Sequence, residues 1–338
     1  MPQTEQPDED ETADTAAPEA QAPPGADEEA PIPLHLTRDW RPAAPPDRKG
    51  AGLPAERVLG LFEGELPEGW CGEPAILAIT SGKGGVGKSS IAGSLALLLA
   101  AAGARVSLID ADLALGHLDV LLGVQPPAVL GDVLAGRKAL RDIFVPLAWG
   151  AEFAGGGMGP APSRVLAPTR RLKLLDEISA LRAEYDLTVL DCSSGVGGEV
   201  LDFCGIADRI FVVATPEPTA LTAAYGLLKA LAGRDELGKA AVVVNQAADR
   251  EEAEDTHERI AAVARQFLGR SVADGGYVLT DPAVAHAVRK RRPFLQAYPR
   301  CEASRCLAQV AARVLPAGRD RQRQRQAGLL ARILGYLE

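Results

Sequence analysis

The chain has 338 residues, a net charge of −9 at pH 7 and five cysteines, none of them in a C-x-x-C motif. Its length allows one large domain or two small ones, and the cysteine pattern argues against an iron–sulfur cluster or a structural metal site. The sequence contains neither a signal peptide nor the roughly 18 consecutive apolar residues of a membrane-spanning helix, so we expect a cytoplasmic protein.

The negative charge is concentrated at the amino terminus. Residues Met1 to Ala30 contain ten acidic residues and no basic one, so they contribute −10 and leave +1 for the rest of the chain. Prolines are frequent and apolar residues sparse as far as residue 72, and such a composition cannot bury enough apolar surface to offset the entropy of ordering. We therefore expect residues 1–72 to form a disordered, acidic, Pro/Ala-rich arm attached to one domain, residues 73–316.

A glycine-rich loop follows the first predicted strand. The apolar run Pro74–Thr80 is typical of a parallel strand that is buried on both faces. It leads into Gly82-Lys83-Gly84-Gly85-Val86-Gly87-Lys88-Ser89, which has the G-x-x-x-x-G-K-[ST] spacing of a P-loop. Apolar residues then recur at helical spacing up to Gly103. A phosphate would therefore lie at a helix amino terminus, with Lys88 as a point charge and Ser89 as a magnesium ligand.

Five further strand-like runs follow, at residues 105–109, 187–190, 209–214, 241–244 and 276–279, with helical patterns between most of them. This alternation predicts an α/β fold, a doubly wound, mostly parallel sheet with helices on both faces and ligands at the carboxyl ends of the strands. Asp110 and Asp112 follow the run at residues 105–109, and Asp191 closes the run at residues 187–190. We expect all three to converge on one phosphate site, with Asp191 as a Walker B acid in the magnesium shell.

The carboxyl-terminal segment, residues 317–338, combines arginines with an apolar stripe. One helical face carries Leu329, Leu330, Ile333, Leu334 and Leu337. This pattern favours a helix lying in the plane of an anionic membrane over the alternative, a terminal helix docked on the core. Because a helix of about a dozen residues is marginal in water, one copy should bind weakly and two copies in a dimer more tightly. A second basic run, residues 289–292, is interpreted either as a basic surface or as a solvated loop.

Lys83 is not required by the general P-loop motif. The run from Lys83 to Ser89 resembles the deviant Walker A signature of the MinD/ParA family of dimerising ATPases. Residues 106–119 and 185–195 look like the two switch stretches of MinD. Within the family, residues 215–225 and 287–299 are similar to the flagellar FlhG/FleN branch.

The resemblance implies an ATP-bound, Mg²⁺-dependent homodimer in which Lys83 reaches the partner subunit's phosphates, as an arginine finger does. It implies catalytic roles for Lys83, Lys88 and Asp112, with Asp112 polarising the hydrolytic water. The implied nucleotide-binding residues are Gly82, Lys83, Gly84, Gly85, Val86, Gly87, Lys88, Ser89, Ser90 and Asn245, of which Asn245 would read the adenine edge. The implied magnesium ligands are Ser89, Asp110 and Asp191.

From this resemblance we expect a slow ATPase switch that regulates the placement or number of flagella. Its implied partners are a second copy of itself, an anionic membrane at the inner face of the cell in the ATP state, and a protein such as a flagellar GTPase. The short D-Q-A-x-x-L-R-like segment with which flagellar members stimulate such a GTPase has no match here.

Other classes share these sequence features. A MinD-like regulator of the division site uses identical parts. A ParA-type partitioning ATPase would favour a basic face for DNA and no amphipathic tail, and we do not expect DNA binding. An Mrp-type iron–sulfur carrier would need paired cysteines, and a pilus-assembly ATPase usually has a degenerate P-loop.

Overall fold

The computed structural model describes residues 76–101, 104–158 and 168–314. The predicted arm, residues 1–72, lies outside the described residues. So does the predicted membrane helix with Leu329, Leu330, Ile333, Leu334 and Leu337. The domain predicted for residues 73–316 is therefore described over nearly its whole length.

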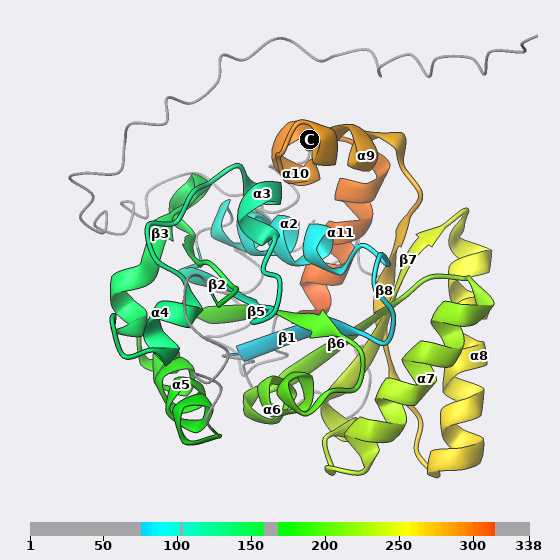
Figure 1. Ribbon diagram of the computed structural model, residues 1–338. Coiled ribbons are helices and arrows are strands. Elements are labelled where there is room, and N and C mark those ends of the chain that lie inside the picture. The colour runs from blue at the N-terminus through cyan, green and yellow to red at the C-terminus, as the bar shows by residue number, and fades with distance from the viewer. Residues whose placement is uncertain (1–75, 102–103, 159–167, 315–338) are drawn as a thin grey trace, which may run out of the picture. The chain divides into compact units, whose positions relative to one another are not determined.

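In these residues eight strands form one sheet (Figure 1). The strands are β1 (Ile76–Ser81), β2 (Val106–Ala111), β3 (Phe144–Pro146), β4 (Glu152–Ala154), β5 (Leu187–Ser194), β6 (Arg209–Ala214), β7 (Ala240–Ala247) and β8 (Ala273–Leu279). Their order is β3-β4-β2-β5-β1-β6-β7-β8. Every pair of neighbours is parallel except β3 and β4. The α/β fold with a mostly parallel sheet is thus confirmed.

Helices alternate with the strands along the chain. They are α2 (Lys88–Ala101), α3 (Leu118–Leu122), α4 (Leu130–Leu134), α5 (Pro168–Ala180), α6 (Gly198–Ile206), α7 (Pro218–Ala232), α8 (Arg250–Leu268), α9 (Pro282–Arg289), α10 (Phe294–Ala297) and α11 (Glu302–Val314). Short 3₁₀ turns span Leu140–Ile143, Ala148–Gly150, Leu181–Ala183 and Leu237–Lys239. None of the helices in the described ranges is long and apolar enough to cross a bilayer.

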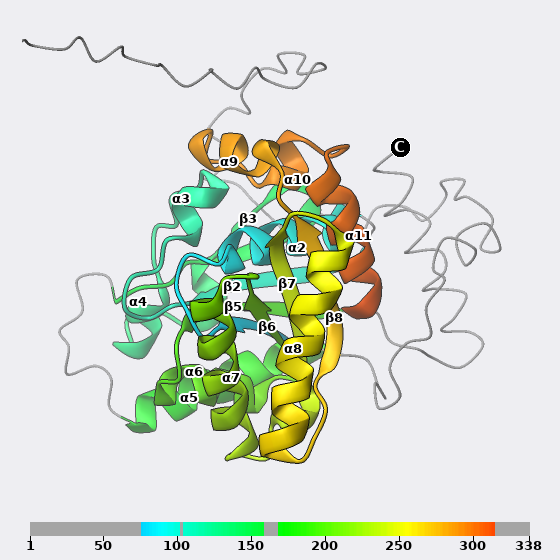
Figure 2. The ribbon, with the colours of Figure 1, turned by 90° about the vertical axis from the view of Figure 1, so that its right-hand side faces the viewer.

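The two faces of the sheet bury separate cores, as the alternation along β1 illustrates. Ile76 and Ala78 pack in the cluster with α4, α5, α6, α7 and α8. Leu77 and Ile79 face the opposite cluster, which contains side chains of α2, α10 and α11. Figures 1 and 2 show helices over both faces. Because both faces are covered, these strands read as continuous apolar runs rather than alternating ones.

The helix that follows the glycine-rich loop is enclosed on all sides. Every residue of α2 from Ile91 to Ala100 is buried, because the helix lies between the sheet and the layer formed by α10 and α11. The loop between β1 and α2 is therefore fixed at both ends by elements that are largely buried. This rigidity is what a preformed anion site requires.

Candidate functional site

The glycine-rich loop and the predicted acids meet at one edge of the sheet. β5 lies between β1 and β2, and Asp110 is directly opposite Asp191 in the β2–β5 register. The loop that begins at Gly82 leaves the same edge, after β1. The structure therefore brings the loop and both aspartates together, as the topology of a parallel sheet predicts.

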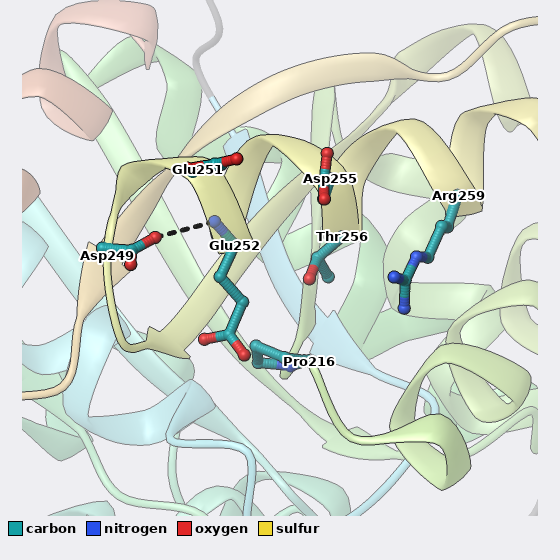
Figure 3. A pocket seen from close by; sticks show the side chains of 7 residues that line it. All are labelled: Pro216, Asp249, Glu251, Glu252, Asp255, Thr256 and Arg259. Atoms are coloured by element: carbon teal, nitrogen blue, oxygen red, sulfur yellow. Dashed lines mark hydrogen bonds between the residues drawn. The ribbon is translucent and has the colours of Figure 1, made fainter.

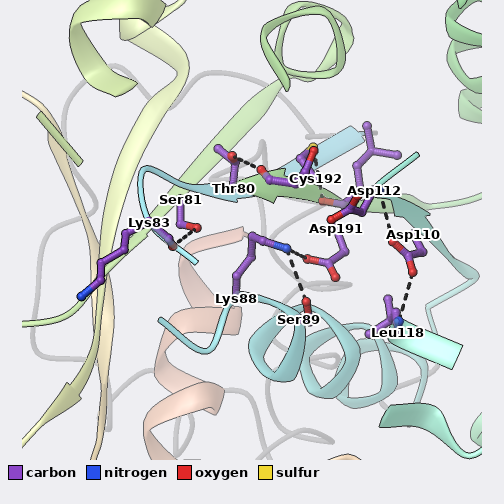
Figure 4. Close-up of polar contacts among 12 residues, drawn as sticks. Thr80, Ser81, Lys83, Lys88, Ser89, Asp110, Asp112, Leu118, Asp191 and Cys192 are labelled. Atoms are coloured by element: carbon purple, nitrogen blue, oxygen red, sulfur yellow. Dashed lines mark hydrogen bonds and ion pairs between the residues drawn. The ribbon is translucent and has the colours of Figure 1, made fainter. Parts of the chain in front are cut away.

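Lys88 and Asp191 form a buried ion pair in this edge (Figure 4). Lys88 Nζ lies 2.7 Å from Asp191 Oδ1 and 3.4 Å from the Ser89 hydroxyl. The two side chains are only 12% and 3% exposed. Burial raises the pKa of Asp191, and the Lys88 charge opposes that rise. A phosphate arriving at the loop would thus compete with Asp191 for the lysine.

Asp110 is held by the backbone that follows its own strand. Its Oδ1 accepts the Asp112 N–H at 3.1 Å, and its Oδ2 accepts the Leu118 N–H at 3.0 Å. Burial, reinforced by the negative charge of Asp191, raises the pKa of Asp110 to about 7. At neutral pH this carboxyl is therefore close to half protonated, and a divalent cation would favour its ionised form.

Asp112 stabilises the turn after β2. Its Oδ1 accepts the N–H groups of Ala114 and Leu115, each at 3.1 Å. Within the described residues its Oδ2 accepts no hydrogen bond, so this oxygen can accept a hydrogen bond from water. The side chain is half-buried beside Asp191.

The loop itself is shaped as an anion cradle. Gly85 and Gly87 have φ angles of +81° and +84°, a region that favours glycine. A Cβ on Gly87 would lie 2.2 Å from the side-chain nitrogen of Asn245. That nitrogen donates to the Val86 carbonyl at 2.7 Å, so Asn245 supports the loop from β7. Left-handed glycines on either side of Val86 help to point backbone N–H groups at a bound anion, and the residues present therefore fit a phosphate.

We predict that Gly87→Ala is more harmful than Gly85→Ala. Both substitutions place a side chain at positive φ, which costs roughly 1–3 kcal/mol. At Gly85 a Cβ would meet nothing within 4 Å, whereas at Gly87 it would displace Asn245. Urea unfolding and phosphate-analogue binding should therefore both be more impaired in Gly87→Ala. Equal losses in the two variants would show that strain alone matters and that the Asn245 contact does not.

Lys83 points away from this cluster (Figure 4). Its Nζ lies 2.7 Å from Glu217 Oε2 and 3.0 Å from Thr219 Oγ1 at the start of α7. The Lys83 and Glu217 side chains are 41% and 62% exposed. Two lysines of one loop thus face different directions, Lys88 into the site and Lys83 onto the surface.

A pocket of about 520 Å³ opens beside the loop. Gly87, Ser90 and Asn245 line it together with Val284 and Val288 of α9. The predicted role of Asn245 in binding a base is therefore compatible with its position. The sequence analysis overlooked the contribution of α9, although the i, i+4 spacing of Val284 and Val288 on this alanine-rich helix was a usable signal.

A second, smaller cavity of about 290 Å³ lies near the amino terminus of α8 (Figure 3). Four of its lining residues are Asp249, Glu251, Glu252 and Asp255. Asp249 caps α8 by accepting the Glu252 N–H at 2.8 Å. The density of carboxylates makes this cavity unsuitable for a phosphate.

The side chains near the loop could bind magnesium only together with oxygen atoms from other ligands. In the described ranges no group of three or more His, Cys, Asp or Glu side chains is arranged to hold a metal ion. Ser89, Asp110 and Asp191 supply hard oxygen atoms at the loop, and Mg²⁺ prefers such ligands together with phosphate oxygens and waters. These three residues therefore fit the magnesium that accompanies a bound nucleotide.

We predict that binding of Mg²⁺ with nucleotide releases a proton at pH 6 but not at pH 8.5. Because the pKa of Asp110 is raised to about 7, the carboxyl is mostly protonated at the lower pH and must lose its proton to meet the cation. Affinity should therefore fall as pH decreases below 7. Calorimetry in buffers of different ionisation enthalpy measures the proton count. Absence of release at pH 6, after subtracting that of free nucleotide, would contradict the role of Asp110.

The comparisons with known proteins agree with this geometry. A family model described as the CobQ/CobB/MinD/ParA nucleotide binding domain matches residues 77–294. The antiactivator FleN of Pseudomonas aeruginosa is 35% identical over 239 residues, which are 71% of this chain and 85% of that protein. The flagellum site-determining protein YlxH of Helicobacter pylori is 32% identical over 58% of this chain and 66% of its own length.

Among solved structures, the septum site-determining protein MinD from Pyrococcus horikoshii, complexed with Mg-ADP, has a TM-score of 0.59 at 22% identity. The match covers 70% of this chain and 94% of that chain. At this identity the similarity concerns the fold, including the central sheet that places the loop and its acids.

Proposed function

The chain belongs to the CobQ/CobB/MinD/ParA family of nucleotide-binding domains, and from this premise we propose that it is an ATP-hydrolysing switch that controls flagellar placement or number. The two flagellar relatives support the cellular role. The family and the intact P-loop support ATP as the nucleotide. The switch works through dimerisation, so that its assembly state, rather than ADP or phosphate, is the output.

The observation that carries this proposal is the divergence of the two lysines. Lys88 is buried in an ion pair with Asp191, where it can reach a phosphate bound to its own loop. Lys83 is held on the surface by Glu217 and Thr219. A second cation that points outward can act on phosphates only across an interface. A second copy of this chain, related by two-fold symmetry, would place each Lys83 opposite the other loop.

Each residue then has a defined task. The loop N–H groups and Lys88 hold the phosphates, while Ser89, Asp110 and Asp191 hold Mg²⁺. Bound there, Mg²⁺ would supply positive charge that stabilises the phosphates. Asp112 uses its Oδ2 to orient a water. Lys83 of the opposite subunit stabilises the negative charge that develops during phosphoryl transfer.

Membrane association follows if the segment 317–338 binds lipid. We predict that the full-length protein co-sediments with anionic vesicles in a non-hydrolysable ATP analogue and not in ADP, because two weak anchors act together only in the dimer. Leu330→Glu/Leu334→Glu should abolish sedimentation without changing nucleotide affinity. Lys83→Ala should reduce it, because each site of the dimer loses one contact with the phosphates of the opposite subunit. Equal sedimentation in both nucleotides would contradict the gated anchor.

The flagellar role is tested in the organism itself. Deletion of the gene should change the number or position of flagella while cell length stays normal. Minicells or filaments with unchanged flagella would instead assign the same switch to division-site placement.

A further inference from the structure

The strand β7 contains one extra residue where it reaches the pocket beside the P-loop. Asn245 pairs with Val278 of β8, and Ala247 pairs with the next residue of β8, Leu279. Gln246 therefore has no counterpart in β8 and forms a bulge, which is rare between parallel strands. Bulges next to binding sites redirect side chains. The position of Gln246 thus depends on an interruption of the sheet rather than on its regular alternation.

The bulge keeps Gln246 out of the core. Val242 and Val244 pack in the cluster that contains side chains of α7 and α8, so strict alternation would place residue 246 in the same cluster. Ala247 occupies that cluster instead, and Gln246 is exposed. Gln246 lines the pocket beside the P-loop together with Gly87. The chain therefore turns this polar side chain away from the core and toward the pocket.

Gln246 also has an uncommon backbone conformation. Its φ angle is +60°, in the left-handed region that residues with a side chain rarely adopt. A glycine would adopt this conformation without strain, yet the sequence has a glutamine at this position. Because strained residues cluster at ligand sites, the conformation indicates that the glutamine side chain itself is used.

The amide of Gln246 is available to a ligand. Within the described residues it has no hydrogen-bond partner. Its Nε2 lies 3.7 Å from the point that a Cβ on Gly87 would occupy, so the amide reaches the glycine-rich loop. By contrast, the carboxylate of Asp281 in the same pocket accepts the N–H groups of Ala283 at 2.8 Å and Ala303 at 3.1 Å. Both oxygens of that carboxylate are therefore engaged.

The neighbouring amide of Asn245 is partly engaged. Its Nδ2 donates to the Val86 carbonyl at 2.7 Å, which leaves Oδ1 as an acceptor. Gln246 has both a donor and an acceptor to offer. Adenine presents a donor, its amino group, beside a ring-nitrogen acceptor, and a glutamine amide matches such a pair with two hydrogen bonds. Of the two amides, that of Gln246 therefore complements the edge of adenine more fully.

We propose that Gln246 recognises the base of the bound nucleotide. Its Oε1 accepts a hydrogen bond from the amino group of adenine, and its Nε2 donates one to a neighbouring ring nitrogen. Val284 and Val288 line the same pocket and offer apolar surface to the faces of the ring. This role rests on the proposed function, since it requires a nucleotide in the pocket, and it adds a residue that selects adenine.

Equilibrium binding of Mg-ADP and of pyrophosphate to the full-length protein separates recognition of the base from recognition of the phosphates. Gln246→Met keeps the length of the side chain and removes both hydrogen bonds. It should weaken binding of Mg-ADP about tenfold and change that of pyrophosphate by less than about twofold. Asn245→Ala should weaken binding of both ligands, because the glycine-rich loop loses its support from β7.

Gln266→Met is the matched control. Gln266 is an exposed glutamine of α8, and it is not among the residues that line the pocket. The substitution is chemically the same as Gln246→Met, so it reports any general effect of replacing an exposed glutamine by methionine. It should change the affinity for neither Mg-ADP nor pyrophosphate.

Analogues of the base identify the atom that Gln246 contacts. The 7-deaza and 1-deaza analogues of ADP each lack one ring-nitrogen acceptor. The native protein should bind one of them about fivefold more weakly than ADP, because one hydrogen bond is lost. Gln246→Met should bind ADP and both analogues equally. Sensitivity to the analogue that persists in Gln246→Met would assign the contact to another residue.

Gln246→Gly tests whether the strained conformation serves the ligand. The variant removes the amide and the strain together, so it should bind Mg-ADP as weakly as Gln246→Met. It should also unfold at a higher urea concentration than the native protein, because glycine adopts a positive φ freely. A lower urea midpoint would show that the Gln246 side chain stabilises the fold and would contradict its use for the ligand.

Two results would overturn the role of Gln246 and leave the proposed function intact. One is equal affinity of the native protein and Gln246→Met for Mg-ADP. The other is an equal loss for Mg-ADP and pyrophosphate in Gln246→Met, which would make Gln246 a support of the loop. Failure of the native protein to bind Mg-ADP would instead contradict the proposed function and this role together.

Discussion

Lys83→Ala is expected to lower the ATPase rate by a factor of about 10³ while leaving the Kd for ATP within about threefold. The Lys83 side chain contacts Glu217 and Thr219, not the carboxylates of the site. Its loss should therefore leave the loop and its own nucleotide undisturbed. Equilibrium binding of a fluorescent ATP analogue and steady-state phosphate release measure the two quantities.

Glu217→Gln is the matched control for this prediction. The Lys83–Glu217 pair is exposed, and such pairs contribute between about 0 and 1 kcal/mol, so removing its charge should change stability little. If Lys83 acts across a dimer, Glu217→Gln keeps most of the ATPase activity. If the contact with Glu217 were the purpose of Lys83, the two variants would be equally inactive.

Lys88→Ala is expected to weaken nucleotide binding by about two orders of magnitude or more, since it removes the cation from the phosphate site. It also leaves Asp191 buried without its partner, and breaking a buried pair in this way costs about 3–5 kcal/mol when the remaining group stays charged. Burial already raises the pKa of Asp191, and the loss of Lys88 should raise it further.

The stability loss of Lys88→Ala should therefore depend on pH. A carboxyl with a raised pKa in the folded state favours folding at low pH, and this contribution is lost as pH increases through that pKa. The variant should lose more stability at pH 8 than at pH 5.5 in urea unfolding. Lys88→Ala/Asp191→Asn should recover stability at pH 8 without recovering nucleotide binding. A pH-independent loss would contradict the buried pair.

Much of the architecture was predictable because it depends on local patterns. Six strands were predicted within a few residues, since buried parallel strands are continuous apolar runs. β3 and β4 were missed, because three-residue strands at the sheet edge bury too little to leave a pattern. The helices on both faces of the sheet and the helix after the P-loop were predicted from the spacing of apolar residues.

The site was predictable only in part. The spacing of the loop and the strand ends brought Lys88, Ser89 and the aspartates together. The contact of Asn245 with Val86 and that of Lys83 with Glu217 join residues 159 and 134 positions apart, and single-sequence patterns carry no information about such distances. The raised pKa of Asp110 likewise depends on burial beside Asp191, which is a tertiary property.

The most direct test of the central claim, that Lys83 acts on the opposite subunit, is a mixing experiment. The Lys83→Ala variant retains Asp112. The Asp112→Asn variant retains Lys83, and its side-chain oxygen can still accept the N–H groups that stabilise the turn after β2. Each variant should be inactive as a homodimer. An equal mixture should recover up to about one quarter of the native ATPase rate, because half of the dimers are mixed and each contains one complete site. No recovery at any ratio, with both variants still binding ATP, would contradict the claim.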